Sequence, residues 1–84
     1  MTTDRDHYFT HRGRQFHLSK KSVEAALQGA WPERIAKYAV RVNGQEYPIR
    51  QVVALATDTP KIEWTSNEAY GILQRIGFQV DTYD

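Results

Sequence analysis

An alternation of apolar and polar residues begins at residue 38. In the segment YAVRV, Tyr38, Val40 and Val42 fall on one face, a period of two that is typical of a strand. The Asn43-Gly44 pair that follows is preferred in two-residue type I′ turns, because both positions need a positive φ. Such a turn pairs Val42 with Gln45, Arg41 with Glu46, and Val40 with Tyr47. One pair is apolar and one joins opposite charges on the other face, so the pattern predicts a β-hairpin in this register.

A proline ends this hairpin. Pro48 has no N–H to donate, so the strand should stop there, and its restricted φ suits the first residue of a helix. The following segment IRQVVALAT places Ile49, Val52, Val53 and Ala56 on one stripe. The pattern therefore predicts a helix over residues 48–57 that follows the strand directly.

A second helix is predicted over residues 66–76. Thr65 and Glu68 have the S/T-x-x-E spacing of a capping box, and Trp64 stands before them as a staple residue. Gly77 is expected in the left-handed conformation that ends a helix, which brings Phe78 back onto its last turn. A short final strand containing Val80 should then join the edge of the hairpin.

The N-terminal third has weaker signals. Two extended pieces are expected on either side of Gly13, within HYFTHRGRQFHLS. Ser19 is the expected N-cap of a helix that Gly29 ends. After it, Trp31 and Ile35 are expected to pack inward.

These elements predict an α+β fold, in which a small antiparallel sheet, made of the Asn-Gly hairpin and the C-terminal strand, packs against two or three short helices. We expect a single domain over residues 1–84, with residues 1–6 disordered. The absence of cysteine excludes disulfides, thiolate zinc sites and a cysteine nucleophile. No apolar run approaches the roughly 20 residues of a membrane span, and the N-terminus does not have the pattern of a signal peptide, so we expect a cytoplasmic protein without a membrane partner.

Charge is unevenly distributed along the chain. The net charge is +1, but residues 1–50 carry +4 and residues 51–84 carry −3. Such polarity either presents a basic face to an anionic partner or is the ordinary asymmetry of a short chain. The cations expected to contact phosphate are Arg12, Arg14, Lys20, Lys21, Arg34, Lys37 and Arg50.

The two predicted helices, 48–57 and 66–76, superficially resemble a helix-turn-helix. The second would present Asn67, Gln74 and Arg75, residue types that read base edges. Their connection is longer than the three or four residues usual in that motif. The alternative is that these three side chains form a solvated helix face.

Sequence patterns of catalysis are missing. The histidines all lie in the first 17 residues, no Gly-x-Ser-x-Gly segment is present, and the glycines do not form a phosphate-binding loop. His7 and His11 are metal-ligand types, but solvated residues near a terminus are the simpler interpretation. We therefore expect a non-enzymatic protein without a catalytic residue, metal, cofactor or small-molecule substrate.

The span YAVRVNGQEYPIRQVVALAT, followed by WTS-x-x-A-x-x-I-L-x-x-x-G-F, resembles N-terminal accessory modules of HNH-type, modification-dependent restriction endonucleases and related bacterial defence proteins. The resemblance covers roughly residues 38–80. The matching residues are Gly44, Tyr47, Pro48, Arg50, Val52, Val53 and Ala56. Arg50 stands where the pattern often has lysine. Since these 84 residues contain no HNH motif, the resemblance implies a binding or assembly role and assigns no catalytic residue.

Two functions remain open at this point. The first is a non-catalytic DNA-binding accessory or regulatory protein that uses the basic surface. The second is a protein-interaction module, or a small homodimeric adaptor in a bacterial defence or regulatory system, that uses exposed aromatic residues or the edge of its sheet.

Overall fold

The structure is a computed structural model that describes residues 6–83. The predicted disordered start, residues 1–6, lies outside the described residues except for Asp6, whose carboxylate is hydrogen-bonded to His17. In chain order the elements are β1 (His7–His11), β2 (Arg14–Leu18), α1 (Lys20–Ala26), β3 (Tyr38–Val42), β4 (Gln45–Pro48), α2 (Ile49–Thr57), the 3₁₀ helix η1 (Lys61–Glu63), α3 (Ser66–Ile76) and β5 (Val80–Thr82).

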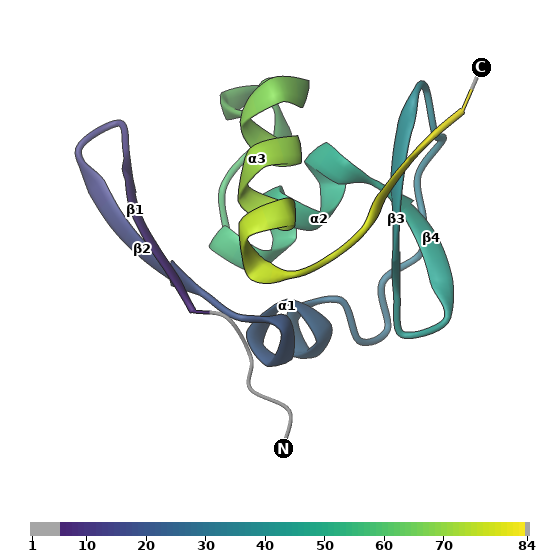
Figure 1. Cartoon of the computed structure of the whole chain (residues 1–84), viewed down its shortest axis with the longest axis horizontal. Helices are drawn as coiled ribbons and strands as arrows, with labels where there is room; N and C mark the ends of the chain where they lie inside the picture. Colours follow the sequence, from purple (N-terminus) through teal and green to yellow (C-terminus); the bar gives the residue numbers. More distant parts are fainter. Residues whose placement is uncertain (1–5, 84) are drawn as a thin grey trace.

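The predicted α+β fold is confirmed. Strands β3 and β4 form the hairpin, and β5 pairs antiparallel with β3, so the sheet has the order β4-β3-β5. Strands β1 and β2 form a second, two-stranded antiparallel sheet. Figure 1 shows α2 and α3 between the two sheets, with α1 below them.

The register of the β3–β4 hairpin is the predicted one. Asn43 and Gly44 have φ values of 53° and 82°, as a type I′ turn requires. Arg41 donates to Glu46 across the exposed face at 3.1 Å. All three predicted pairs are present: Val42 with Gln45, Arg41 with Glu46, and Val40 with Tyr47.

The sequence pattern predicts Pro48 as the first residue of the helix, but it is the residue just before it. It is the last residue of β4 and the N-cap of α2, with φ −60° and ψ 140°, and the helix begins at Ile49. The restricted φ of proline fits both strand and helix, and here the extended ψ assigns the residue to the strand. The direct passage from strand to helix is confirmed.

The predicted starts of α1 and α3 and the predicted end of α3 are present, but the helix end predicted at Gly29 is wrong, because α1 already ends at Ala26 with Leu27 as its C-cap. The Ser19 side chain caps α1, and Thr65 and Glu68 form the capping box of α3. At the other end of α3, Gly77 has φ 113°, and the Phe78 N–H donates to the Leu73 carbonyl at 3.0 Å. Phe78 is buried against the core, as this end geometry expects.

The inward packing predicted for Trp31 is wrong. Its side chain is 83% exposed, and Ile35 is only half-buried. The core is formed instead by one apolar cluster between the sheets and helices, whose largest fully buried members are Trp64, Tyr47, Leu27, Leu73 and Ile76. None of the helices in the described part of the chain has the length and apolar character that a bilayer crossing requires.

Candidate nucleic-acid interface

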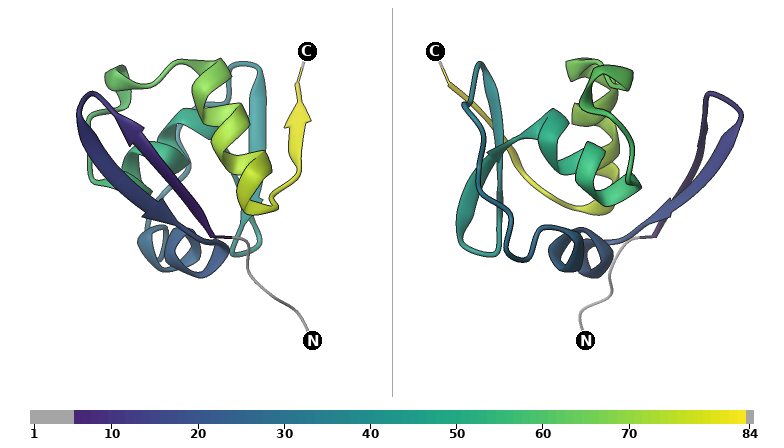
Figure 2. Two further views of the ribbon diagram at one scale, coloured as in Figure 1. Left: turned by 60° about the vertical axis from the view of Figure 1, so that its left-hand side comes forward. Right: turned by 180° about the vertical axis from the view of Figure 1, so that it is seen from behind.

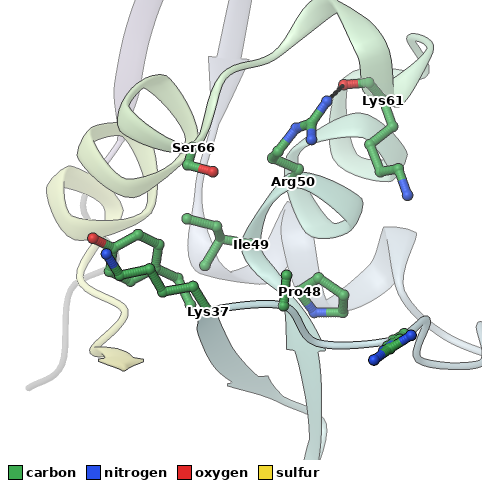
Figure 3. A pocket seen from close by; sticks show the side chains of 9 residues that line it. Lys37, Pro48, Ile49, Arg50, Lys61 and Ser66 are labelled. Atoms are coloured by element: carbon green, nitrogen blue, oxygen red, sulfur yellow. Dashed lines mark hydrogen bonds between the residues drawn. The ribbon is translucent and has the colours of Figure 1, made fainter. Parts of the chain in front are cut away.

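Four parts of the chain meet around a small hollow at the start of α2. They are the segment before β3, the β4–α2 junction, η1 and the first residue of α3 (Figure 3). The hollow has a volume of about 150 Å³. We call it the basic hollow, and its lining residues are Arg34, Ala36, Lys37, Tyr38, Pro48, Ile49, Arg50, Lys61 and Ser66.

The lining of the basic hollow is strongly cationic. Four of its nine residues are Arg34, Lys37, Arg50 and Lys61, and none of these nine described residues is an aspartate or glutamate. Cations gathered around one concave surface repel each other and raise the local concentration of anions. The chemistry of the hollow therefore suits an anionic group, such as a phosphate.

Arg50 is the most firmly held of these cations. Its Nε donates to the Trp64 carbonyl at 2.7 Å, and its Nη2 donates to the Lys61 carbonyl at 3.3 Å, the bond drawn in Figure 3. The guanidinium group thus ties α2 to the segment between η1 and α3. Because arginine has five N–H donors, others remain for a ligand while the side chain stays fixed.

Lys61 and Lys37 are less constrained. Lys61 forms an ion pair with Glu33 at 2.7 Å, and both side chains are about half-exposed. The Lys37 Nζ lies 5.3 Å from the centroid of the Tyr38 ring. An exposed ion pair contributes little to stability, so an incoming anion can compete with Glu33 for Lys61.

Helix α3 begins at this hollow. Ser66 is its first residue, and the helix N-terminus carries a partial positive charge. The Glu68 carboxylate accepts from the Thr65 N–H at 2.9 Å, and this bond is the main cause that holds the pKa of Glu68 below its usual value. The partial charge of the helix adds to the cations, but the capping carboxylate offsets part of it.

The predicted phosphate contacts do not all lie together. Arg34, Lys37 and Arg50 line the basic hollow. Arg12 and Arg14 lie at the turn of the β1–β2 hairpin, and Lys20 and Lys21 begin α1, where the Lys20 Nζ lies 5.3 Å from the centroid of the Phe78 ring. The structure therefore divides the basic residues of the first half into separate groups.

The three residues predicted to read base edges, Asn67, Gln74 and Arg75, lie exposed on α3. The β1–β2 hairpin stands beside this helix, and Arg75 lines a shallow hollow with His7 and Phe9 of β1. The connection from α2 to α3 includes η1, longer than a helix-turn-helix connection. The β1–β2 hairpin thus lies along one side of α3, the helix that would have to enter the major groove of DNA in a helix-turn-helix.

The two candidate metal ligands take other partners. His11 Nε2 donates to the Glu63 carbonyl at 3.1 Å, and its ring stacks on Trp64 with centroids 3.8 Å apart. Burial, and secondarily the charge of Arg75, lowers the pKa of His7. Within residues 6–83, no group of three or more His, Asp or Glu side chains is arranged to hold a metal ion.

Sequence reasoning missed Lys61 as a member of this site. It lies in the acidic second half of the chain, in a connection that has no helical or strand periodicity. Only the return of η1 to the start of α2 brings it beside Arg50. The Pro60 that precedes it marks a turn but indicates no partner.

Comparison with known proteins identifies a family. A family model described as SCO5918-like matches residues 13–84, so the chain belongs to the SCO5918-like family. No curated protein and no solved structure matches the chain.

Proposed function

We propose that this SCO5918-like protein is a non-catalytic DNA-binding protein that contacts the phosphate backbone through the basic hollow. The observation that carries the proposal is that Arg34, Lys37, Arg50 and Lys61 all line one concave surface with no acidic residue in its described lining. These residues come from three different parts of the chain. Basic residues on solvated surfaces are more often interspersed with acidic ones.

Phosphate contacts bind DNA without reading its sequence. Each cation that neutralises a phosphate releases condensed counterions, so the affinity falls as salt rises. Arg50, held by its two hydrogen bonds, and the exposed Arg34 and Lys37 would contact the DNA backbone, although the net charge of the protein is only +1. Binding of this kind suits an accessory or regulatory role in the cytoplasm.

The resemblance of residues 38–80 to accessory modules of restriction endonucleases supports DNA as the nucleic acid. The matched span contains Arg50 and the strand–helix junction that forms one wall of the basic hollow. Arg34 and Lys37 lie just before this span, and Lys61 lies within it. The proposed site therefore sits on the part of the chain that the resemblance covers and on its N-terminal border.

The test is the binding of labelled duplex and single-stranded oligonucleotides, followed by fluorescence anisotropy over a range of salt concentrations. The double variant Arg34→Gln/Lys37→Gln should weaken binding and reduce the slope of log K against log salt by about 1 to 2, because about 0.7 to 0.9 is lost per phosphate contact. Arg50 is left unchanged, since its bonds to Trp64 and Lys61 support the fold.

The matched control is Arg12→Gln/Arg14→Gln, which removes two charges from the turn of the first hairpin. It should change the slope less than the hollow variant does. Equal losses in the two variants would mean that overall charge, not the basic hollow, attracts the DNA. No binding of either oligonucleotide at low salt would refute the proposal outright.

A further inference from the structure

Trp31 is the most exposed aromatic residue in the described part of the chain. Its side chain is 83% exposed, although tryptophan is usually largely buried. It lines a second, wider hollow of about 630 Å³ between the end of α1 and the β3–β4 hairpin. We call this the Trp31 hollow, and its lining residues are Leu27, Gln28, Gly29, Ala30, Trp31, Asn43, Gln45 and Tyr47.

The backbone that carries Trp31 is firmly held. Gln51 of α2 is 6% exposed, and its side-chain amide bonds the segment twice. Its Nε2 donates to the Trp31 carbonyl and its Oε1 accepts from the Glu33 N–H, both at 2.8 Å. The Tyr47 hydroxyl also donates to the Ala30 carbonyl, at 3.3 Å. The backbone around Trp31 is therefore held by hydrogen bonds, while its indole ring is exposed to solvent.

The lining of the Trp31 hollow differs from that of the basic hollow. Its polar side chains are the amides of Gln28, Asn43 and Gln45 and the hydroxyl of Tyr47, and no charged side chain is among these described residues. An aromatic face beside amide donors and acceptors suits a planar, uncharged ring with polar edges. A nucleobase has this chemistry, because its face stacks and its edge forms hydrogen bonds.

The two hollows lie on the same segment of the chain. Trp31 is three residues before Arg34, so their Cα atoms are separated by at most about 11 Å. In the right-hand view of Figure 2, this segment leaves α1 and runs along the hairpin to the start of β3. A strand whose phosphates occupy the basic hollow would therefore bring its neighbouring bases within reach of Trp31.

We propose that Trp31 stacks on an unpaired base of a nucleic-acid strand, and that the Trp31 hollow receives this base. The inference rests on the proposed function, and it narrows the partner to a single strand or a duplex with a displaced base. In an intact duplex both faces of each base are covered by neighbouring bases, which leaves no face for the indole. Gln51 acts as a positioning residue that holds the Trp31 backbone.

The test compares three probes by anisotropy: oligothymidylate, an abasic strand of equal length, and a duplex. The abasic strand keeps the phosphates and lacks the bases, so it reports on the basic hollow alone. Oligothymidylate should bind the protein more tightly than the abasic strand does. Trp31→Ala should weaken oligothymidylate binding about 5- to 150-fold, the range for stacking of one base on an aromatic side chain, and leave abasic binding unchanged.

Two further variants serve as controls. Trp31→Phe keeps an aromatic face and should retain most of the affinity, while Tyr8→Ala removes an aromatic residue of 72% exposure from the first hairpin and should have no effect. Oligothymidylate should also quench the fluorescence of Trp31, since the other tryptophan, Trp64, is 1% exposed. In the Trp31→Phe variant this quenching should disappear.

The outcomes separate the two proposals. Equal binding of oligothymidylate and the abasic strand would overturn the role of Trp31 and leave the basic hollow in place. Loss of binding only in Trp31→Ala, with Arg34→Gln/Lys37→Gln unaffected, would instead overturn the proposed phosphate site. If sedimentation shows a dimer that Trp31→Ala dissociates, Trp31 belongs to a protein interface and the inference is wrong.

Discussion

The buried polar side chains in the described part of the chain each have a defined partner. Thr57 donates to the Val53 carbonyl at 2.7 Å, and its hydroxyl lies 2.7 Å from that of Thr59. Thr59 in turn accepts from the Trp64 Nε1 at 2.7 Å. No buried side-chain nitrogen or oxygen atom of residues 6–83 lacks a hydrogen-bond partner. This network holds the segment that follows α2, and Gln51 holds the segment before β3. Moving either segment would leave a buried polar group without a partner, which is energetically costly.

His7 is the residue for which we predict a pH effect on stability. Its pKa in the folded protein is lowered, first by burial and then by Arg75, so the folded state disfavours the imidazolium. The unfolded chain binds the proton at a higher pH, near 6.5. The contribution of His7 to the free energy of unfolding is therefore fully present above that pH. It is lost as the pH falls through the lower pKa of the folded state. Melting temperatures measured between neutral and mildly acidic pH should fall less steeply in His7→Gln.

His17→Gln is the matched control, because His17 lies on the exposed face of the same hairpin, beside Asp6. Glu68, His11 and Arg75 also lie around His7 in the hollow between β1 and α3, and all three stay unchanged in both variants. Parallel pH curves for wild type and His7→Gln would contradict the prediction.

At the scale of elements, the helix ends show how local chemistry defines structure. Helix α3 has the predicted capping box, with the Thr65 hydroxyl accepting from the Glu68 N–H at 3.1 Å. Helix α1 has an equivalent box in which Ser22 takes the place of the usual Glu or Gln. Each box satisfies two N–H groups at a helix start that have no partner within the helix.

Thr65→Ala should therefore destabilise the protein by about 0.5 to 2 kcal/mol, the usual range for loss of an N-cap side chain. Thr65→Ser keeps the hydroxyl and should remain close to wild type. Urea unfolding measures both, with no expected change in the denaturant slope. A midpoint for Thr65→Ala that equals that of Thr65→Ser would show that the cap contributes nothing here.

At the scale of the whole molecule, Trp64 connects the two sheets through the helices. It is 1% exposed and belongs to the central apolar cluster. The ring of His11 in the first hairpin stacks on it. The rings of Phe9 and Phe16 each meet it edge-on, and the centroid of each lies 6.1 Å from that of Trp64. The first hairpin thus packs on the rest of the protein in part through this indole, together with buried Leu18 and the bond from His11 to the Glu63 carbonyl.

Trp64→Ala should lower the free energy of unfolding by about 3 to 5 kcal/mol, the range for truncating a buried aromatic residue. This is a large part of the total stability expected for a domain of this size. Trp64→Phe keeps an aromatic ring for His11 and loses the bond to Thr59, so its loss should be smaller. Thermal unfolding followed by circular dichroism measures both variants. A melting temperature of Trp64→Ala close to that of wild type would refute the docking role.

The sequence alone was enough for features that depend on neighbouring residues. Asn43 and Gly44 prefer the positive φ of the turn, and the alternation around them selects one register. The box of Thr65 and Glu68 and the glycine at residue 77 define the ends of α3 in the same way. In each case the competing interactions lie within a few residues, so the local preference decides.

Only the tertiary structure decided which distant residues share a surface. Arg34, Arg50 and Lys61 line the same hollow because η1 folds back onto α2, while Arg12 and Arg14 lie on a separate hairpin. Trp31 faces solvent on a segment whose backbone is held by Gln51, twenty residues further along the chain. These placements depend on contacts between residues far apart in the chain, which a hydrophobic pattern does not encode.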